Sequence, residues 1–195
     1  LYTNPQSRGR IAHWMMEEIG EPYDTVWLDY GTSMKAPAYL AVNPMGKVPA
    51  LRHGDAVVTE AAAICAYLAE AFPARGLLPR TANERADYLR WLFFAAGPLE
   101  QAVVARALGW QVSEGRSAMV GFGSYEATLD ALASMLATRD FVCGDRFTAA
   151  DVYVGSAIVW GMLFGTIDKR PAFEAYAGRL QARPAYGRAV RINED

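Results

Sequence analysis

The chain has 195 residues, of which 52% are hydrophobic, 12% aromatic and 21% charged, and these values are ordinary for a globular protein. This composition excludes a disordered, collagen-like or low-complexity chain, and the length suits one domain or two small ones. Lys and Arg number 19 against 21 Asp and Glu, a formal net charge of -2, so no overall positive field favours nucleic acid or an acidic membrane surface.

Cysteine and histidine are scarce. Cys65 and Cys143 are far apart in the chain, which predicts two buried thiols in a reducing compartment rather than a disulfide framework. His13 and His53 have no Cys or His nearby, so no metal site is predicted. No apolar run approaches the roughly 20 residues that span a bilayer. We therefore expect a cytoplasmic protein without nucleic-acid, membrane or metal partners.

The first part of the chain, residues 1–74, alternates short strand patterns with two helical patterns. Apolar residues recur at helical spacing from Ala12 to Ile19, and Gly20 stands where a helix C-cap is expected. Strands are predicted at residues 1–3, 25–29, 48–51 and 56–59, the last two as a hairpin, and a second helix at residues 61–72. This order predicts a thioredoxin-like α/β domain.

Residues 82–195 show only helical patterns and follow a linker at residues 75–81. The first of these helices is long, and Pro98 should kink it. Further apolar stripes lie at residues 125–136, 152–163 and 173–180. Within the second stripe, the small residues Gly155 and Ser156 predict a close approach by neighbouring helices. We therefore expect an all-α second domain.

The segment from Asn43 to Leu51 carries the most chemical information. Pro49 has no N–H, so within a strand it needs an edge or an irregularity, and a cis Val48–Pro49 bond is one way to provide it. The backbone N–H and C=O of Val48 would then face outward and could pair with an extended peptide. A plain edge strand with a trans proline fits the same residues equally well, so both interpretations stay open.

Two helix starts are the other candidate sites. At Glu60 and Ala61 a strand runs into a helix whose free N–H groups would hold a carboxylate, while the Glu60 side chain could meet an ammonium group. Ser7 precedes the first helix, either as its N-cap or as a hydroxyl that donates to an anion. From spacing alone, a purely structural role is the simpler interpretation of both.

Three segments in this order resemble the cytosolic glutathione transferase family: Asn43–Leu51, Thr59–Leu68 and Gly144–Asp151. The last contains a capping box, Thr148 to Asp151. The resemblance covers essentially the whole chain, and the overall character of the sequence is similar to bacterial members, either serine-type or unclassified. It implies a thioredoxin-like glutathione domain, an all-α domain that supplies the second-substrate pocket, and a homodimer.

The resemblance also implies roles for individual residues around glutathione. Val48, beside cis Pro49, is implied as the backbone partner of the cysteinyl moiety. Glu60 and Ala61 fall where the family holds the γ-glutamyl end of the tripeptide. Many members carry Ser at the second of these positions, and Ala61 keeps its backbone N–H but removes the hydroxyl.

The implied catalytic residue is Ser7, with Asn4 as another candidate donor. Lys47 is implied as a partner of a tripeptide carboxylate, and Lys35 as a candidate for the glycyl end. The implied activity uses glutathione as co-substrate and activates its thiolate for attack on a small-molecule electrophile or a peroxide. The alternatives are a non-catalytic interaction or scaffold module, and a glutathione-dependent isomerase or dehalogenase.

Overall fold

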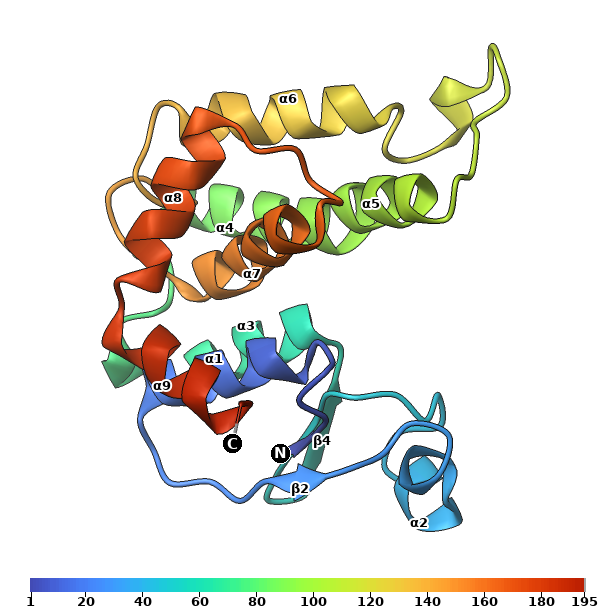
Figure 1. Ribbon diagram of the computed structural model, residues 1–195. Coiled ribbons are helices and arrows are strands. Elements are labelled where there is room, and N and C mark those ends of the chain that lie inside the picture. The colour runs from blue at the N-terminus through green and yellow to red at the C-terminus, as the bar shows by residue number, and fades with distance from the viewer. Residues whose placement is uncertain (195) are drawn as a thin grey trace. The chain divides into compact units, whose positions relative to one another are not determined.

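The computed structural model describes residues 1–194, which form two compact units (Figure 1). One contains residues 1–78 together with the chain from residue 181 onward, and the other contains residues 79–180. The predicted architecture, an α/β part followed by helices, is confirmed. The predicted second domain runs to residue 195, whereas the last helix packs with the first unit; the division at residues 74 and 82 stays a prediction.

The first unit contains a four-stranded sheet in the order β2-β1-β3-β4. The strands are β1 (Tyr2–Thr3), β2 (Val26–Trp27), β3 (Ala50–His53) and β4 (Ala56–Thr59). β1 pairs in parallel with β2 and antiparallel with β3, and β3 and β4 form the predicted hairpin. β2 is shorter than predicted. The parallel pair requires a crossover, which the first helix supplies.

The helices of this unit are α1 (Gly9–Ile19), α2 (Pro37–Leu40), α3 (Ala61–Ala71) and α9 (Pro184–Ile192), with short 3-10 turns at Ser33–Lys35 and Pro73–Arg75. The predicted apolar face of α1 is buried, with Met15 and Ile19 completely covered. Gly20 ends the helix at φ 70°, and its N–H donates to the Met16 carbonyl at 2.8 Å. The predicted C-cap is therefore confirmed.

The last helix, α9, lies beside α1 in the same unit (Figure 1). The Arg183 guanidinium donates to both carboxylate oxygens of Glu18, each at 2.7 Å. The rings of Trp14 and Tyr186 meet edge to face with centroids 5.0 Å apart. The carboxyl-terminal helix is therefore part of the first unit's packing.

The second unit is helical. It contains α4 (Ala82–Phe94), α5 (Glu100–Ala107), α6 (Tyr125–Leu136), α7 (Ala149–Phe164) and α8 (Pro171–Gln181), with a 3-10 turn at Ser117–Met119. A π-helical turn, Ala95–Leu99, contains Pro98 and joins α4 to α5, so the long helix is interrupted where predicted. A Cβ on Gly155 would lie 2.1 Å from the Leu180 side chain, which confirms the predicted close approach to α7.

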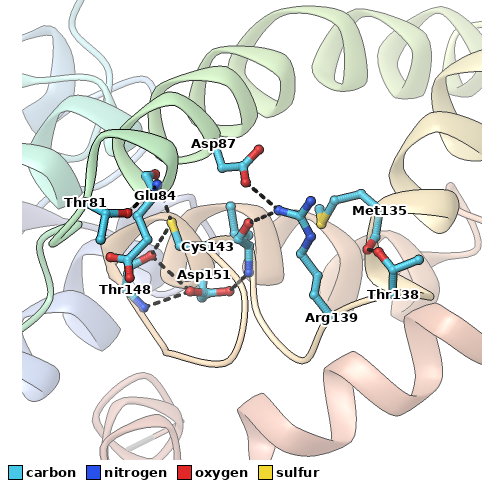
Figure 2. A network of polar contacts seen from close by, with 10 residues as sticks. Thr81, Glu84, Asp87, Met135, Thr138, Arg139, Cys143, Thr148 and Asp151 are labelled. Carbon is cyan, nitrogen blue, oxygen red and sulfur yellow. Dashed lines mark hydrogen bonds and ion pairs between the residues drawn. The ribbon is translucent and has the colours of Figure 1, made fainter.

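The predicted capping box starts α7 (Figure 2). Asp151 is completely buried, and its carboxylate accepts bonds from the Thr148 N–H and hydroxyl at 2.8 and 3.0 Å. The Val142 N–H and the Tyr176 hydroxyl donate to its other oxygen at 2.7 and 2.8 Å. Burial raises the pKa of Asp151 to about 6, although the four hydrogen bonds favour the charged form. The capping box therefore joins the loop at Val142, the start of α7 and helix α8.

Candidate active site

One end of the sheet gathers the predicted site residues. Ala50, the first residue of β3, pairs with Tyr2 of β1 on one side and with Thr59 of β4 on the other. Because β1 and β4 both run antiparallel to β3, the chain leaves β1 and β4 at the end where it enters β3. Segments 4–8, 48–49 and 60–61 therefore meet at the same end of the sheet.

The segment before β3 presents a free backbone edge. The Val48–Pro49 peptide bond is cis, so of the two interpretations open from the sequence the structure adopts the cis form. The Val48 side chain packs on the cluster that includes Tyr39 and Ala50. Within residues 1–194, the Val48 N–H and C=O have no hydrogen-bond partner. They are available to an extended peptide, as β-strand addition requires.

Two buried side chains fix the peptide group that precedes Val48. The Tyr39 hydroxyl donates to the Lys47 carbonyl at 2.6 Å, and the Asn43 side-chain amide donates to the same oxygen at 2.8 Å. Tyr39 and Asn43 are only 4% and 6% exposed. Burial raises the pKa of Tyr39, which keeps its phenol in the donating form. The Lys47 carbonyl and the Val48 N–H share one rigid amide, so both bonds also orient that N–H.

The turn between these anchors depends on glycine. Gly46 has φ 57°, and a Cβ there would lie 2.6 Å from the Met34 carbonyl oxygen and 2.9 Å from Lys35 Nζ. The Lys35 ammonium donates to the carbonyls of Met45 and Gly46, both at 3.0 Å. Lys35 therefore holds the turn with two of its three donors. Lys47 is exposed, and its ammonium has no partner within residues 1–194.

The start of α3 has an unusual backbone. Glu60 has φ 66° and ψ 119°, the one positive φ among non-glycine residues in the described chain. Such a conformation costs about 1–3 kcal/mol and recurs at ligand-binding sites. The Glu60 carbonyl accepts the first helical bond from Ile64 at 2.9 Å, which leaves the N–H groups of the first turn, from Ala61 on, unused by the helix. The Glu60 side chain is exposed and Ala61 is buried.

The loop between β1 and α1 holds Ser7. Its hydroxyl donates to the Asn4 carbonyl at 2.7 Å and accepts the Gly9 N–H at 2.9 Å. The N-cap position belongs to Arg8, so the prediction that Ser7 is the N-cap is wrong by one residue. Ser7 lies one residue before the N-cap, and from that position its hydroxyl oxygen still accepts the N–H of Gly9, the first residue of the helix. A Cβ on Gly9 would lie 1.8 Å from Thr3 Oγ1, so only glycine fits there.

The other candidate donor, Asn4, is engaged within the loop. Its side-chain amide donates to the Leu28 carbonyl at 2.8 Å, and its side-chain oxygen accepts the Gln6 N–H at 2.9 Å. Asn4 is 9% exposed. These bonds tie the loop to the end of β2, and the Asn4 amide, like the Ser7 hydroxyl, donates to a backbone carbonyl.

Three contributors were not recognised from the sequence as site residues: the Tyr39 hydroxyl, the Asn43 amide and the strained Glu60 backbone. The turn motif contains Asn43, so its presence was visible, but its donation to Lys47 was not. Cys65 and Cys143 are buried as predicted, and burial raises the pKa of both thiols, that of Cys143 to about 11. Neither is an accessible thiolate.

Residues 1–194 contain no group of three or more His, Cys, Asp or Glu side chains that could hold a metal ion. No helix in this range is both long and apolar enough to cross a bilayer.

The fold and the site define the class of protein: a thioredoxin-like unit with an unpaired backbone edge beside a cis-proline, followed by a helical unit. Family models agree: the model for the glutathione S-transferase N-terminal domain matches residues 8–71, and that for the C-terminal domain matches residues 55–179. The chain belongs to the glutathione S-transferase family.

Individual relatives support this assignment. Glutathione S-transferase 3 of Zea mays is 30% identical over 97% of this chain and 92% of its own length. A glutathione transferase from Methylococcus capsulatus is 31% identical with a TM-score of 0.80, covering 100% of this chain and 98% of that one. A sphingomonad glutathione S-transferase solved with glutathione is 32% identical with a TM-score of 0.79 and the same coverage.

Proposed function

We propose that this chain activates the thiol of glutathione and transfers it to a small electrophile. The observation that carries the proposal is the free Val48 backbone edge at the sheet end where Ser7 and the start of α3 also lie. The named relatives are transferases, which favours catalysis over the scaffold alternative.

In this proposal, glutathione lies along the edge in an extended form. Its cysteinyl amide pairs with the Val48 N–H and C=O, whose orientation the bonds to the Lys47 carbonyl fix. Its γ-glutamyl carboxylate meets the free N–H groups at the start of α3, where the helix dipole also favours an anion. Glu60 meets the γ-glutamyl ammonium, and Lys47 meets the glycyl carboxylate. Lys35 contributes positive charge while it holds the turn.

The proposed role of Ser7 is to stabilise the thiolate. A free thiol has a pKa of about 8.5, and lowering it by two units requires about 2.7 kcal/mol of preferential stabilisation. The Ser7 hydroxyl must rotate from the Asn4 carbonyl to the sulfur, while its oxygen keeps the Gly9 N–H. One charge-assisted hydrogen bond together with the amino-terminal end of α1 supplies most of that energy.

The reaction is then a simple displacement. The thiol proton passes to solvent, and the sulfur lone pair forms a bond to the electrophilic carbon. The leaving group departs with the electrons of its bond to that carbon. With a peroxide, the thiolate attacks one oxygen instead, the O–O bond breaks, and the other oxygen leaves as the alcohol, which gives glutathione sulfenic acid. The thiol of a second glutathione then attacks the sulfenic sulfur, which forms the disulfide and releases water.

The test uses retention of the whole chain on immobilised glutathione, with elution by the free tripeptide, and the variant Ser7→Ala. We expect Ser7→Ala to raise the pKa of bound glutathione, followed by thiolate absorbance, and to lower kcat more than it raises KM. An unchanged thiol titration removes Ser7 from this role. A chain that is not retained, and shows no binding heat with glutathione, refutes the proposed function itself.

Self-association is a further part of this proposal. Leu89 and Phe93, four residues apart on α4, are 44% and 74% exposed and form an apolar stripe on a helix surface. A second copy of the chain would cover such a stripe, and sedimentation equilibrium of the native chain against Phe93→Glu tests this.

A cytoplasmic location also belongs to this proposal.

A further inference from the structure

Tyr30 lies three residues after the end of β2, close to the loop that carries Ser7. Its hydroxyl donates to the Gln6 carbonyl at 3.2 Å. Gln6 immediately precedes Ser7, so this bond acts on the peptide group that enters Ser7. The Tyr30 side chain therefore extends from its own loop to the peptide group that links Gln6 to Ser7.

The loop after β1, residues 4–8, and the loop after β2, residues 28–33, are joined by hydrogen bonds in both directions. Asn4 donates from the first loop to the Leu28 carbonyl in the second, and Tyr30 donates from the second loop back to Gln6. The second loop is also closed on itself, because the Asp29 N–H donates to the Ser33 hydroxyl at 2.7 Å. Tyr30 is therefore held at its hydroxyl, and the residue before it is held at its backbone N–H.

The aromatic ring of Tyr30 is more exposed than buried. Tyr30 is 59% exposed, and the bond to Gln6 is the one hydrogen bond or ring contact that its side chain makes within residues 1–194. An exposed aromatic ring is normal on a surface, but the polar end of this ring is anchored on the peptide group that enters Ser7. An anchored ring loses little conformational freedom when a ligand packs on it.

We infer that Tyr30 is a specificity-determining residue whose ring packs against an aromatic second substrate beside the glutathione sulfur. This inference rests on the proposed function and assigns the substrate class: electrophiles whose reacting carbon belongs to, or adjoins, a planar aromatic group. Offset or edge-to-face contact between aromatic rings strengthens binding by about three- to tenfold beyond the area buried.

The test compares two electrophiles that react at the same sulfur. With 1-chloro-2,4-dinitrobenzene, a carbon–sulfur bond forms at the ring carbon and chloride leaves with the electrons of the carbon–chlorine bond. Iodomethane loses iodide in the same way but carries no ring. We expect Tyr30→Leu to lower kcat/KM for the aromatic substrate about fivefold, and that for iodomethane less than twofold. The KM for glutathione should not change.

Two further variants separate the ring from the hydroxyl. Tyr30→Phe keeps the ring, so it should retain most of the aromatic preference. Tyr67→Leu removes a ring and a hydroxyl that contacts His53 at 3.0 Å, outside the two loops, and it should leave the preference unchanged. If Tyr30→Phe lowers turnover of both electrophiles and raises the pKa of bound glutathione, Tyr30 donates to sulfur and the assignment is overturned.

Binding of products distinguishes failure of this inference from failure of the proposed function. The native chain should bind S-(2,4-dinitrophenyl)glutathione about fivefold more tightly relative to S-methylglutathione than Tyr30→Leu does. Equal ratios in the two proteins overturn the assignment of Tyr30 and leave the proposed function standing. No binding of either compound by the native chain overturns both.

Discussion

The strained backbone of Glu60 leads to a prediction in which the stability of the fold and the affinity for glutathione change independently. Its φ of 66° and ψ of 119° cost about 1–3 kcal/mol when a side chain is present. Glu60→Gly removes that cost but adds freedom to the unfolded chain, which offsets about 0.4–1 kcal/mol. Glu60→Ala keeps the Cβ and therefore the strain. We expect the glycine variant to exceed the alanine variant by about 1 kcal/mol in free energy of unfolding.

Both variants lack the carboxylate, so both should bind glutathione about tenfold more weakly than the native chain, as expected for loss of one charge-assisted hydrogen bond at an exposed site. Chemical denaturation gives the stabilities, and the melting temperatures should differ by about 2–4 °C. Calorimetry gives the affinities. Equal stability of the two variants would show that the backbone stores no strain. Native affinity in the alanine variant would remove Glu60 from the γ-glutamyl site.

Three further predictions concern other parts of the molecule. Because burial raises the pKa of Asp151 from 3.8 to about 6, the folded state holds this proton more tightly than the unfolded state, and stability falls as pH rises through that range. Denaturation of the native chain and Asp151→Asn at pH 4 and pH 7 should show the native chain's advantage in free energy of unfolding shrinking by about 2 kcal/mol, and a constant difference would contradict this. Gly46→Ala should destabilise by about 2 kcal/mol or more, because its Cβ meets the Met34 carbonyl, whereas Gly54→Ala, with open space and φ 59°, should cost only about 1 kcal/mol; similar losses in thermal melts would count against the contact. Ala61→Ser should tighten glutathione binding by a few-fold, since it adds a hydroxyl beside the α3 start, and unchanged calorimetric affinity would show that this position does not touch the tripeptide.

Patterns that depend on local chemistry were predictable from the sequence. The α1 stripe, the Gly20 cap and the capping box of α7 follow from side-chain spacing, and the structure confirms all three. The turn before Val48 was located correctly, but its proline isomer was not decided, because the same residues suit either form. The local propensities of Glu60 do not predict a positive φ, since the surrounding structure imposes it.

Hydrogen bonds between residues that are distant in the sequence could not be predicted from the spacing of residue types. The donation from Tyr39 to Lys47 spans a turn, and that from Tyr30 to Gln6 joins loops 24 residues apart. The apolar stripes identified from the sequence end at residue 180, so α9 was covered only by the general prediction that residues 82–195 are helical, and nothing showed which unit it would join. Its partner surface is on α1, at the other end of the chain, and only the folded structure brings the two together.

The position of α9 has a consequence for biosynthesis. Arg183 and Arg188 pair with Glu18 and Glu17, so the surface of α1 is completed by residues translated more than 160 positions later. A nascent chain that has emerged only as far as residue 78 holds the whole sheet but lacks Tyr186, whose ring packs against Trp14. A part of the chain that is translated early is thus completed by a helix that is translated much later, and fragments cut at the unit boundary lack this surface.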